Sequence, residues 1–390
     1  MLDPFSPAPE WLREVVEPLA SLFNIPVLLG HCHEVVVIFF VYIFIHYVLS
    51  PWLSPKLFPH HYPNLNKRTK LNWDVHVVSL VQSTFISAIA LWVLFVDEER
   101  KSMTSRERVL GYSGSCALIS SLATGYFIYD LIISTIYLKM FGIGMLSHAV
   151  SALWVFSFGF RPFLNFYAPV FILYELSSPF LNIHWFLDKV NMTGSSMQWY
   201  NGMALLIVFF FCRLVWGTWQ SVYVYMDMFG ALGQTWAAGP PSALNPVDIT
   251  TEIFQARNDD PLCISEACLE ISKYAKHTAG GIPTWLVATY VTSNIVLNGL
   301  NYYWFSKMIE TVLKRFRPAV SKQEAPANET KNLTEHNKEN STAEDFAQQA
   351  ILDAAAKLEQ EEGSLFLGDD HQAATSGVDA DVSDLRNRKA

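Results

Sequence analysis

Long apolar runs separated by short polar segments make up the chain as far as about residue 310. A helix needs about 20 mostly apolar residues to cross roughly 30 Å of hydrocarbon. By this criterion the pattern predicts membrane-spanning helices at residues 33–51, 75–96, 113–138, 143–160, 163–186, 202–229 and 284–307. We therefore predict an all-α polytopic membrane protein with about seven transmembrane helices.

The segment ahead of the first span carries an apolar stripe. Residues at helical spacing would share one face of a helix: Trp11, Leu12, Val15, Val16, Leu19 and Phe23. This stripe predicts a short amphipathic helix within residues 1–30, lying on the membrane surface or packed on the body of the protein. The acidic residues of this segment and the absence of a basic start argue against a signal peptide.

Tryptophans and prolines add detail to the predicted spans. Tryptophans lie near the span ends, as expected of an aromatic belt at the membrane–water interface: Trp52, Trp73, Trp92, Trp185, Trp199 and Trp285. Pro162, Pro169 and Pro179 interrupt the fifth span, and the carbonyl groups that they free need partners or water. Residues 160–162 alone join the fourth span to the fifth, which predicts a tight hairpin.

The composition agrees with a membrane protein, and the charge separates a tail from the body. Of the 390 residues, 51% are hydrophobic and 16% are charged. The formal net charge is −9, of which residues 319–390 contribute −8 through 15 acidic and 7 basic residues. A neutral body argues against a nucleic-acid partner. We expect residues 319–390 to form a disordered acidic tail, in which a weak amphipathic helix at 345–362 could bind a protein partner.

Basic residues in the short loops predict the orientation. If the N-terminus is lumenal, the cytosolic segments hold most of the lysines and arginines: Lys56, Lys67, Arg68, Lys70, Lys139, Lys189, Lys307, Lys314, Arg315 and Arg317. The positive-inside rule therefore predicts a lumenal N-terminus and a cytosolic C-terminus. The sequons at Asn191, Asn328, Asn332 and Asn340 would then face the cytosol and stay unglycosylated.

Cysteine usage predicts no disulfide framework. Cys32, Cys116 and Cys212 lie in or beside apolar runs, where buried thiols are expected. Cys263 and Cys268 share one long loop and could form a disulfide if that loop is lumenal, or remain free thiols if it is cytosolic. No further ligands are spaced nearby as a zinc site requires, so we expect no metal site.

Several polar residues fall inside the predicted spans, mostly in the cytosolic half. Charged groups at this depth cost about 2.5–3.5 kcal/mol, which favours a functional site over simple packing for His148, Asp130, Glu175 and Arg213. For the neutral groups, hydrogen bonding between helices is at least as good an explanation as lipid binding: His76, Asn182, Asn298 and Asn301.

A histidine beside an acid can act as a general base or carry an acyl group. We therefore take His148, Asp130 and Glu175 as the candidate catalytic residues of an acyl transfer to a lipid amine or alcohol. The same polar chamber could instead hold a lipid headgroup without reacting. In that case Arg213 would be the principal headgroup ligand, with His76, Asn182 and Asn298 as further lipid-binding candidates.

Five segments resemble, in order, the motifs of one membrane family. They are NWDVHVVSLVQS at 72–83, GYFIYDL at 125–131, MLSHAVSALW at 145–154, YELSSPFLNIHWFLD at 174–188 and FFFCRLVWG at 209–217. Together they resemble the TLC domain, named for TRAM, LAG1 and CLN8, and are most similar to its TMEM56-like branch. The resemblance covers residues 70–318. Residues 1–30 lie outside the domain, as do residues 31–69, which contain the first span and a cytosolic loop.

The resemblance implies six helices around a central cavity, a location in the endoplasmic reticulum and a role in lipid synthesis, sensing or trafficking. Ceramide synthases of this family use a pair of histidines in the fourth helix to transfer an acyl group from acyl-CoA to a sphingoid base. Here Ser147 stands at the first position of that pair, and His148 alone remains.

These observations predict a protein of the endoplasmic reticulum that binds membrane lipid in an intramembrane cavity and contributes to lipid homeostasis, without a cofactor. The first alternative is an acyltransferase related to the ceramide synthases of sphingolipid synthesis, with acyl-CoA as a substrate. The second is an interaction scaffold that acts through the acidic tail.

Overall fold

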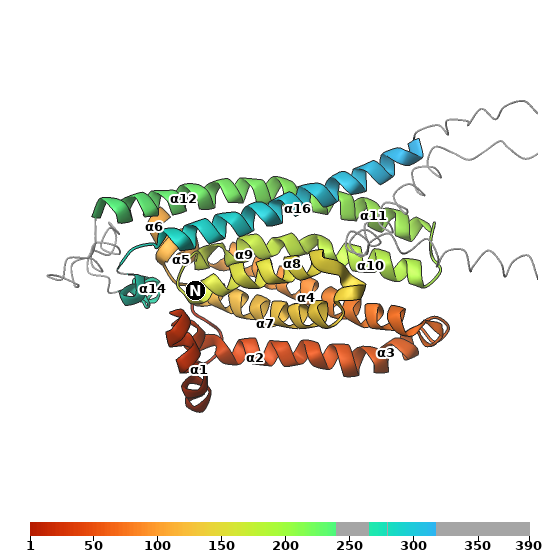
Figure 1. The fold of residues 1–390 in the computed structure, drawn as a ribbon, viewed down its shortest axis with the longest axis horizontal. Coiled ribbons are helices and arrows are strands. Elements are labelled where there is room, and N and C mark those ends of the chain that lie inside the picture. Colours follow the sequence, from red (N-terminus) through yellow and green to blue (C-terminus); the bar gives the residue numbers. More distant parts are fainter. Residues whose placement is uncertain (239–264, 279, 317–390) are drawn as a thin grey trace, which may run out of the picture.

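The computed structural model describes residues 1–238, 265–278 and 280–316, and all regular elements within these ranges are helices (Figure 1). In this part of the chain, 5 helical segments are long and apolar enough to cross a membrane: Leu28–Leu57, Lys67–Val96, Ser105–Ile136, Leu138–Phe160 and Ser196–Ala237. The predicted class, an all-α polytopic membrane protein, is therefore confirmed. The predicted acidic tail lies outside the described residues.

The N-terminal helix lies across the direction of the bundle (Figure 1). This helix, α1 (Glu10–Phe23), contains the predicted stripe, and its apolar residues Trp11, Val15 and Leu19 are exposed. These three side chains do not pack on the body, although α1 contacts α2 and its Ala20 is buried. The position of α1 on a membrane surface stays a prediction.

The first two crossings are long and nearly continuous. The first consists of α2 (Leu28–Phe44), the π-turn η1 (Ile45–Leu49) and α3 (Ser50–Leu57). After the short η2 (Tyr62–Asn64), the second is α4 (Lys67–Val96). The side chain of Asn66 caps α4 by accepting a hydrogen bond from the Thr69 N–H.

The most buried crossing lies at the centre of the bundle. The short helices α5 (Glu98–Lys101) and α6 (Ser105–Leu110) lead into α7 (Gly114–Ile136), which packs against both α2 and α8. Gly125 permits the approach of α2, because a Cβ atom there would lie 2.7 Å from the Val35 carbonyl oxygen.

The next two crossings include irregular backbone. The fourth is α8 (Leu138–Ser157), kinked at Gly142 with φ of 78°, followed by η3 (Phe158–Phe160). The fifth is assembled from four short pieces: η4 (Asn165–Tyr167), α9 (Ala168–Phe171), η5 (Ile172–Ser177) and α10 (Ser178–Lys189). Pro169 and Pro179 lie in the first turns of α9 and α10, so the predicted interruption of this span is observed.

The last crossings complete the bundle. The sixth joins α11 (Ser196–Phe209), the π-turn η6 (Phe210–Val215) and α12 (Trp216–Ala238). Two short helices, α14 (Glu266–Ile271) and α15 (Ala275–Thr278), precede α16 (Thr284–Phe316). Three asparagines, Asn294, Asn298 and Asn301, lower the hydropathy of α16 relative to the other long helices.

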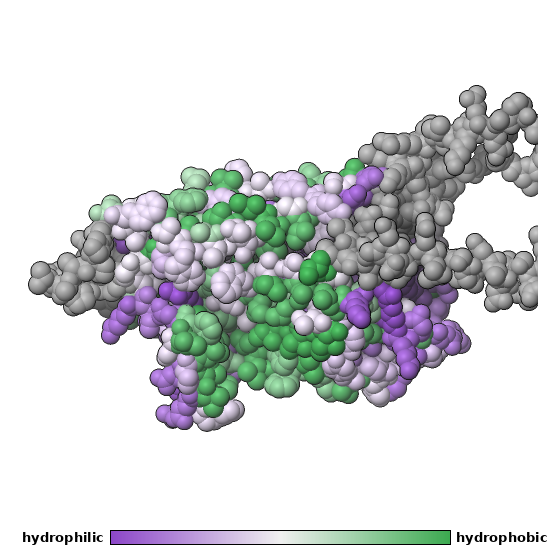
Figure 2. Space-filling view, in the orientation of Figure 1, coloured by the Kyte–Doolittle hydropathy of each residue, from purple (hydrophilic) through white to green (hydrophobic). Residues whose placement is uncertain are grey.

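Successive crossings alternate in direction. The N-terminus and the last described turn of α16 therefore lie at opposite ends of the bundle (Figure 1). Figure 2 shows apolar surface over the middle of the molecule and hydrophilic residues near both ends. This distribution is the one that a membrane-spanning bundle requires.

Two of the tryptophans expected in an aromatic belt are instead part of the core. Trp73 and Trp185 are buried, with ring centroids 5.9 Å apart, and the indole N–H of Trp73 donates to Ser54 Oγ. The belt prediction is therefore wrong for this pair, because the packing of α4 against α10 covers both rings. Trp52, Trp92 and Trp285 are exposed as predicted.

Candidate functional site

A cavity within the bundle collects several of the predicted polar residues. Its wall is formed by residues of α7, α8, α9, η5, η6 and α16, and is mostly apolar and aromatic. The polar side chains that line it include His148, Tyr174, Glu175, Arg213, Asn294 and Asn301. The structure thus brings together three residues that the sequence marks as costly inside a membrane, namely His148, Glu175 and Arg213.

The His148 ring lies between aromatic side chains. It is on α8, about two turns beyond the kink at Gly142, with ring centroids 6.3 Å from Phe127 and 6.2 Å from Trp304. Its Nδ1 atom is buried and has no hydrogen-bond partner among the described residues. Because buried polar atoms in native proteins are almost always partnered, this nitrogen is available to a ligand or water.

Arg213 is positioned by the π-turn η6. Its Nε donates to the Tyr174 carbonyl oxygen at 2.9 Å and to Ser177 Oγ at 3.0 Å, and one Nη donates to Asn301 Oδ1 at 3.1 Å. These acceptors are neutral, so the guanidinium satisfies the irregular backbone of η5 and ties it to α16. Direct pairing of Arg213 with a carboxylate is not among the contacts within the described residues.

Glu175 is connected to Arg213 through a hydroxyl group. Ser178 Oγ donates to Glu175 Oε2 at 2.8 Å and accepts from Arg213 Nη2 at 3.3 Å. The carboxylate and the guanidinium therefore share one serine while both line the cavity. A polar group bound there would meet a hydrogen-bond acceptor, a cation and an imidazole.

The asparagines of α16 form a network beside the cavity. Tyr174 Oη donates to Asn298 Oδ1 at 3.0 Å, and Asn298 Nδ2 donates to Ser221 Oγ at 2.9 Å and to Asn294 Oδ1 at 3.0 Å. Asn298 does not line the cavity, so it holds helices together rather than facing a ligand. Sequence reasoning missed Tyr174 and Asn294, although the spacing of Asn294 and Asn298 by one helical turn is a visible signal.

His76 and Asn182 lie apart from the cavity. His76 Nδ1 donates to Asn182 Oδ1 at 2.7 Å, and the imidazole stacks on Trp185 with centroids 4.2 Å apart. Asn182 Nδ2 also donates to Ser79 Oγ at 3.0 Å. These contacts fasten α10 to α4, which matches the structural explanation of the two residues. Asp130 is buried on α7 and is not part of the cavity lining.

The cysteines fall into two groups. Cys32, Cys116 and Cys212 are free and buried, as predicted. Cys268 is buried and disulfide-bonded. Cys263 lies outside the described residues, so the pairing of Cys263 with Cys268 stays a prediction.

Comparisons with known proteins identify the family. The TLC domain profile matches residues 72–310, which is more than half of the chain. An uncharacterized TLC domain-containing protein of Schizosaccharomyces pombe is 34% identical over 304 residues, covering 78% of this chain and 86% of the relative. No solved structure matches the chain.

Two further relatives lie in other organisms. Topoisomerase I damage affected protein 4 of Saccharomyces cerevisiae is 27% identical over 298 residues, covering 75% of this chain and 88% of its own length. TLC domain-containing protein 4 of Homo sapiens is 28% identical over 193 residues, covering 47% of this chain and 72% of its own length. Together with the profile match, these similarities show that the chain belongs to the TLC domain family.

Proposed function

We propose that this protein binds a membrane lipid in the cavity lined by His148, Glu175 and Arg213, and that it contributes in this way to lipid homeostasis in the endoplasmic reticulum. The supporting observation is that an unpartnered imidazole nitrogen, a carboxylate and a guanidinium share one cavity within an apolar bundle. Such groups inside a membrane are costly and are functional sites by default.

The polar and apolar residues of the cavity lining indicate where the headgroup and the acyl chain of a lipid would lie. His148 Nδ1 and the Glu175 carboxylate accept hydrogen bonds, so they suit a headgroup that carries an amine or a hydroxyl. Phe127, Ile172 and Leu297 offer apolar surface for the start of an acyl chain. The recognised ligand is therefore an amino or hydroxyl lipid with its polar group at His148.

The space inside the cavity limits how this lipid enters. The volume of the cavity that is open to the centres of water molecules is about 50 Å³, which is room for a few waters. A lipid headgroup is larger than this space, so its entry requires side chains such as Trp304, whose ring lies beside His148, to move.

Lipid analysis of the purified protein tests the proposal. We expect the protein, extracted in mild detergent, to retain an amino or hydroxyl lipid that mass spectrometry identifies, and His148→Ala to lower its amount severalfold. His76→Ala is the matched control, because it removes a membrane histidine outside the cavity. Equal lipid in the wild type and in folded His148→Ala would contradict the proposal.

A second candidate function is acyl transfer from acyl-CoA, with His148 as base or acyl carrier and Glu175 in the same cavity. The unpartnered Nδ1 atom favours it, because a general base needs a free nitrogen directed at the substrate. Microsomes supplied with acyl-CoA and a panel of sphingoid bases and lysolipids would form product with the wild type and none with His148→Ala. No product from folded protein that carries lipid would leave binding as the function.

A further inference from the structure

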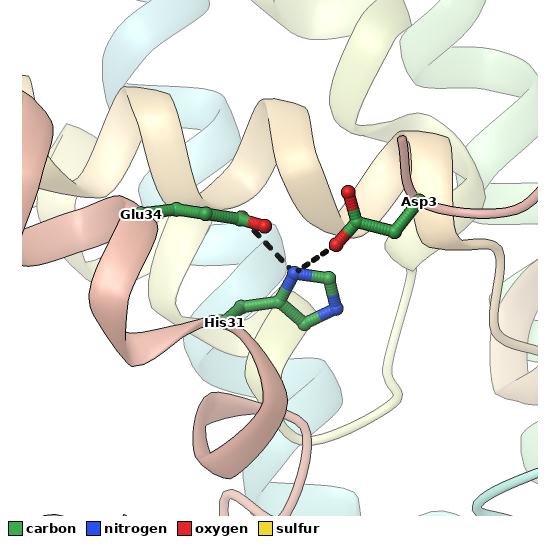
Figure 3. A group of neighbouring side chains, drawn as sticks. All are labelled: Asp3, His31 and Glu34. Carbon is green, nitrogen blue, oxygen red and sulfur yellow. Dashed lines mark hydrogen bonds and ion pairs between the residues drawn. The ribbon is translucent and has the colours of Figure 1, made fainter. Parts of the chain in front are cut away.

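A second polar cluster lies outside the cavity lining, where the N-terminal segment meets the start of α2. His31 and Glu34 are one turn apart on α2, and Asp3 approaches them from the N-terminal segment (Figure 3). His31 Nδ1 lies 3.0 Å from Glu34 Oε2 and 3.1 Å from Asp3 Oδ2. One donor atom from each residue lies within 4.8 Å of the other two.

Burial makes this arrangement costly without a positive charge at its centre. The side chains of His31 and Glu34 are only 3% and 4% exposed, and that of Asp3 is 16% exposed. Two carboxylates that converge in such surroundings repel each other. The second oxygen of Glu34, Oε1, is buried and has no hydrogen-bond partner within the described part of the chain. A cation held between the carboxylates would offset their repulsion, while Glu34 Oε1 lies 4.0 Å from His33 Nε2.

The second ring nitrogen of His31, Nε2, has a hydrogen-bond partner, as is common in metal-binding histidines. His31 Nε2 lies 2.7 Å from the hydroxyl of Tyr112, which is itself buried. If Nε2 donates its proton to Tyr112, the lone pair of Nδ1 points between the two carboxylates. Metal-ligating histidines commonly have their second nitrogen fixed by such an outer partner.

We propose that Asp3, His31 and Glu34 bind a divalent transition-metal ion, with Zn²⁺ as the ion that best fits one imidazole and two carboxylates. Zinc–ligand distances of about 2.0–2.2 Å place neighbouring ligand atoms of a tetrahedral site roughly 3.3 Å apart, so the observed 3.0 and 3.1 Å need only a small outward shift. This proposal replaces the sequence-based expectation of no metal site.

The metal would join separate parts of the fold. Asp3 belongs to the segment that precedes α1, whereas His31 and Glu34 belong to the first crossing, and Tyr112 precedes α7. An ion at this point therefore fastens the N-terminal segment to the bundle. The competing arrangement has a proton in place of the metal, with a positively charged His31 donating to both acids.

Zinc binding by the full-length protein separates these arrangements. The protein, purified with a tag that lacks histidine and stripped with a chelator, is titrated with Zn²⁺ in a calorimeter, and its thermal midpoint is measured with and without the ion. We expect one bound equivalent and a higher midpoint with zinc, because an ion that binds only the folded state stabilises it. Binding should weaken at least about tenfold in His31→Ala.

Two further variants make the result decisive. Asp3→Asn removes a ligand from the N-terminal segment, outside the bundle, and we expect it to weaken zinc binding as well. His60→Ala removes an exposed histidine and should bind zinc like the wild type. No zinc binding by the wild type, or binding unchanged in both ligand variants, would overturn the proposal and leave the proton-bridged cluster.

Discussion

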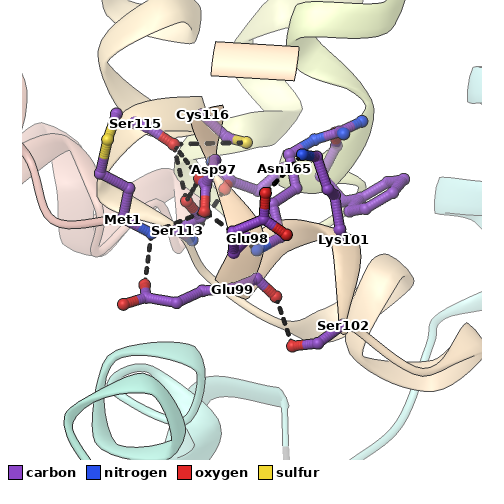
Figure 4. Close-up of polar contacts among 12 residues, drawn as sticks. Met1, Asp97, Glu98, Glu99, Lys101, Ser102, Ser113, Ser115, Cys116 and Asn165 are labelled. Atoms are coloured by element: carbon purple, nitrogen blue, oxygen red, sulfur yellow. Dashed lines mark hydrogen bonds and ion pairs between the residues drawn. The ribbon is translucent and has the colours of Figure 1, made fainter. Parts of the chain in front are cut away.

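Asp97 organises the polar contacts at the N-terminal end of the bundle. Its carboxylate accepts hydrogen bonds from Ser113 Oγ at 3.2 Å and Ser115 Oγ at 2.6 Å, and it pairs with the Met1 amine at 2.9 Å (Figure 4). Burial alone would raise the pKa of Asp97, but the hydrogen bonds from Ser115 and the Arg100 N–H hold that pKa below its ordinary value. The charged form therefore stabilises the folded protein.

This lowered pKa predicts how Asp97→Asn changes stability with pH. A carboxyl whose pKa is lower in the folded state stabilises the fold above its unfolded pKa of about 3.9, and this contribution is lost as the pH falls through the folded value. At pH 7 we expect the variant to lose about 1.5–3 kcal/mol of unfolding free energy.

Thermal midpoints of the wild type and Asp97→Asn at neutral and acid pH measure this effect. The difference between the two midpoints should narrow below about pH 4. Glu98→Gln is the control, because the Glu98 side chain is 79% exposed and should contribute little. A midpoint difference that stays constant at all pH values would contradict the claim that the charged form of Asp97 stabilises the fold.

The sequence predicted only in part which intramembrane charged residues line the cavity. His148, Glu175 and Arg213 share a cavity, as their cost inside a membrane suggested, whereas Asp130 carries the same cost and lies elsewhere. Depth along a helix follows from the residue number, but the direction of a side chain depends on helix rotation. Packing between helices sets that rotation, and one sequence does not specify it.

At the scale of elements, the cavity depends on irregular backbone. The fifth crossing is broken at η5, and the sixth contains the π-turn η6, with Arg213 donating from one to the other. Backbone of this kind is tolerated at membrane depth where it lines a cavity or is buried in protein. The prolines predicted the break in the fifth crossing. The π-turn η6 has no comparable signal in the sequence.

The contact of α12 with η5 gives a prediction at this scale. A Cβ atom at Gly217 would lie 2.6 Å from the Tyr174 hydroxyl oxygen, so Gly217→Ala must push Tyr174 aside and break its hydrogen bond to Asn298. We expect a loss of about 1–3 kcal/mol of unfolding free energy.

Chemical denaturation or thermal melting in detergent measures this loss. Gly230→Ala on the same helix is the matched control, because nothing lies within 4 Å of a Cβ atom there. The control should be neutral or slightly stabilising, since alanine favours a helix over glycine. Equal melting of the two variants would show that Gly217 is not needed for the close approach of Tyr174.

At the scale of the whole molecule, the order of the helical passes could be predicted from apolar runs alone, whereas 5 of them in the described part of the chain are long and apolar enough to cross a membrane. Each of the seven predicted runs overlaps one helical pass, including the broken 163–186 and the asparagine-containing 284–307, and 113–138 extends beyond α7 at both ends. The sequence could not show that Trp73 and Trp185 would be covered, because a span end in one helix can be an interior position beside another. Nor did it indicate the Asp3 cluster, whose residues come from separate segments.

The orientation in the membrane is a prediction at this scale. The loop between α10 and α11, which contains the sequon at Asn191, lies at the end opposite the N-terminus (Figure 1). With a lumenal N-terminus, Asn191 stays unmodified, and an Asn-x-Thr sequence introduced between α12 and α14 becomes glycosylated. Endoglycosidase treatment of the expressed protein reads out both sites, and a glycan at Asn191 would reverse the proposed topology.

A substitution that fills the cavity without altering its polar groups tests whether this cavity binds lipid. Ala152 is a buried residue of the cavity wall on α8, whereas Val150 on the same helix is 50% exposed. We compare the lipid retained by Ala152→Phe, Val150→Phe and the wild type, each purified in mild detergent and shown to melt cooperatively. We expect Val150→Phe to keep the wild-type amount of one specific lipid and Ala152→Phe to lose most of it. Equal retention of the same lipid by all three proteins would contradict lipid binding in this cavity.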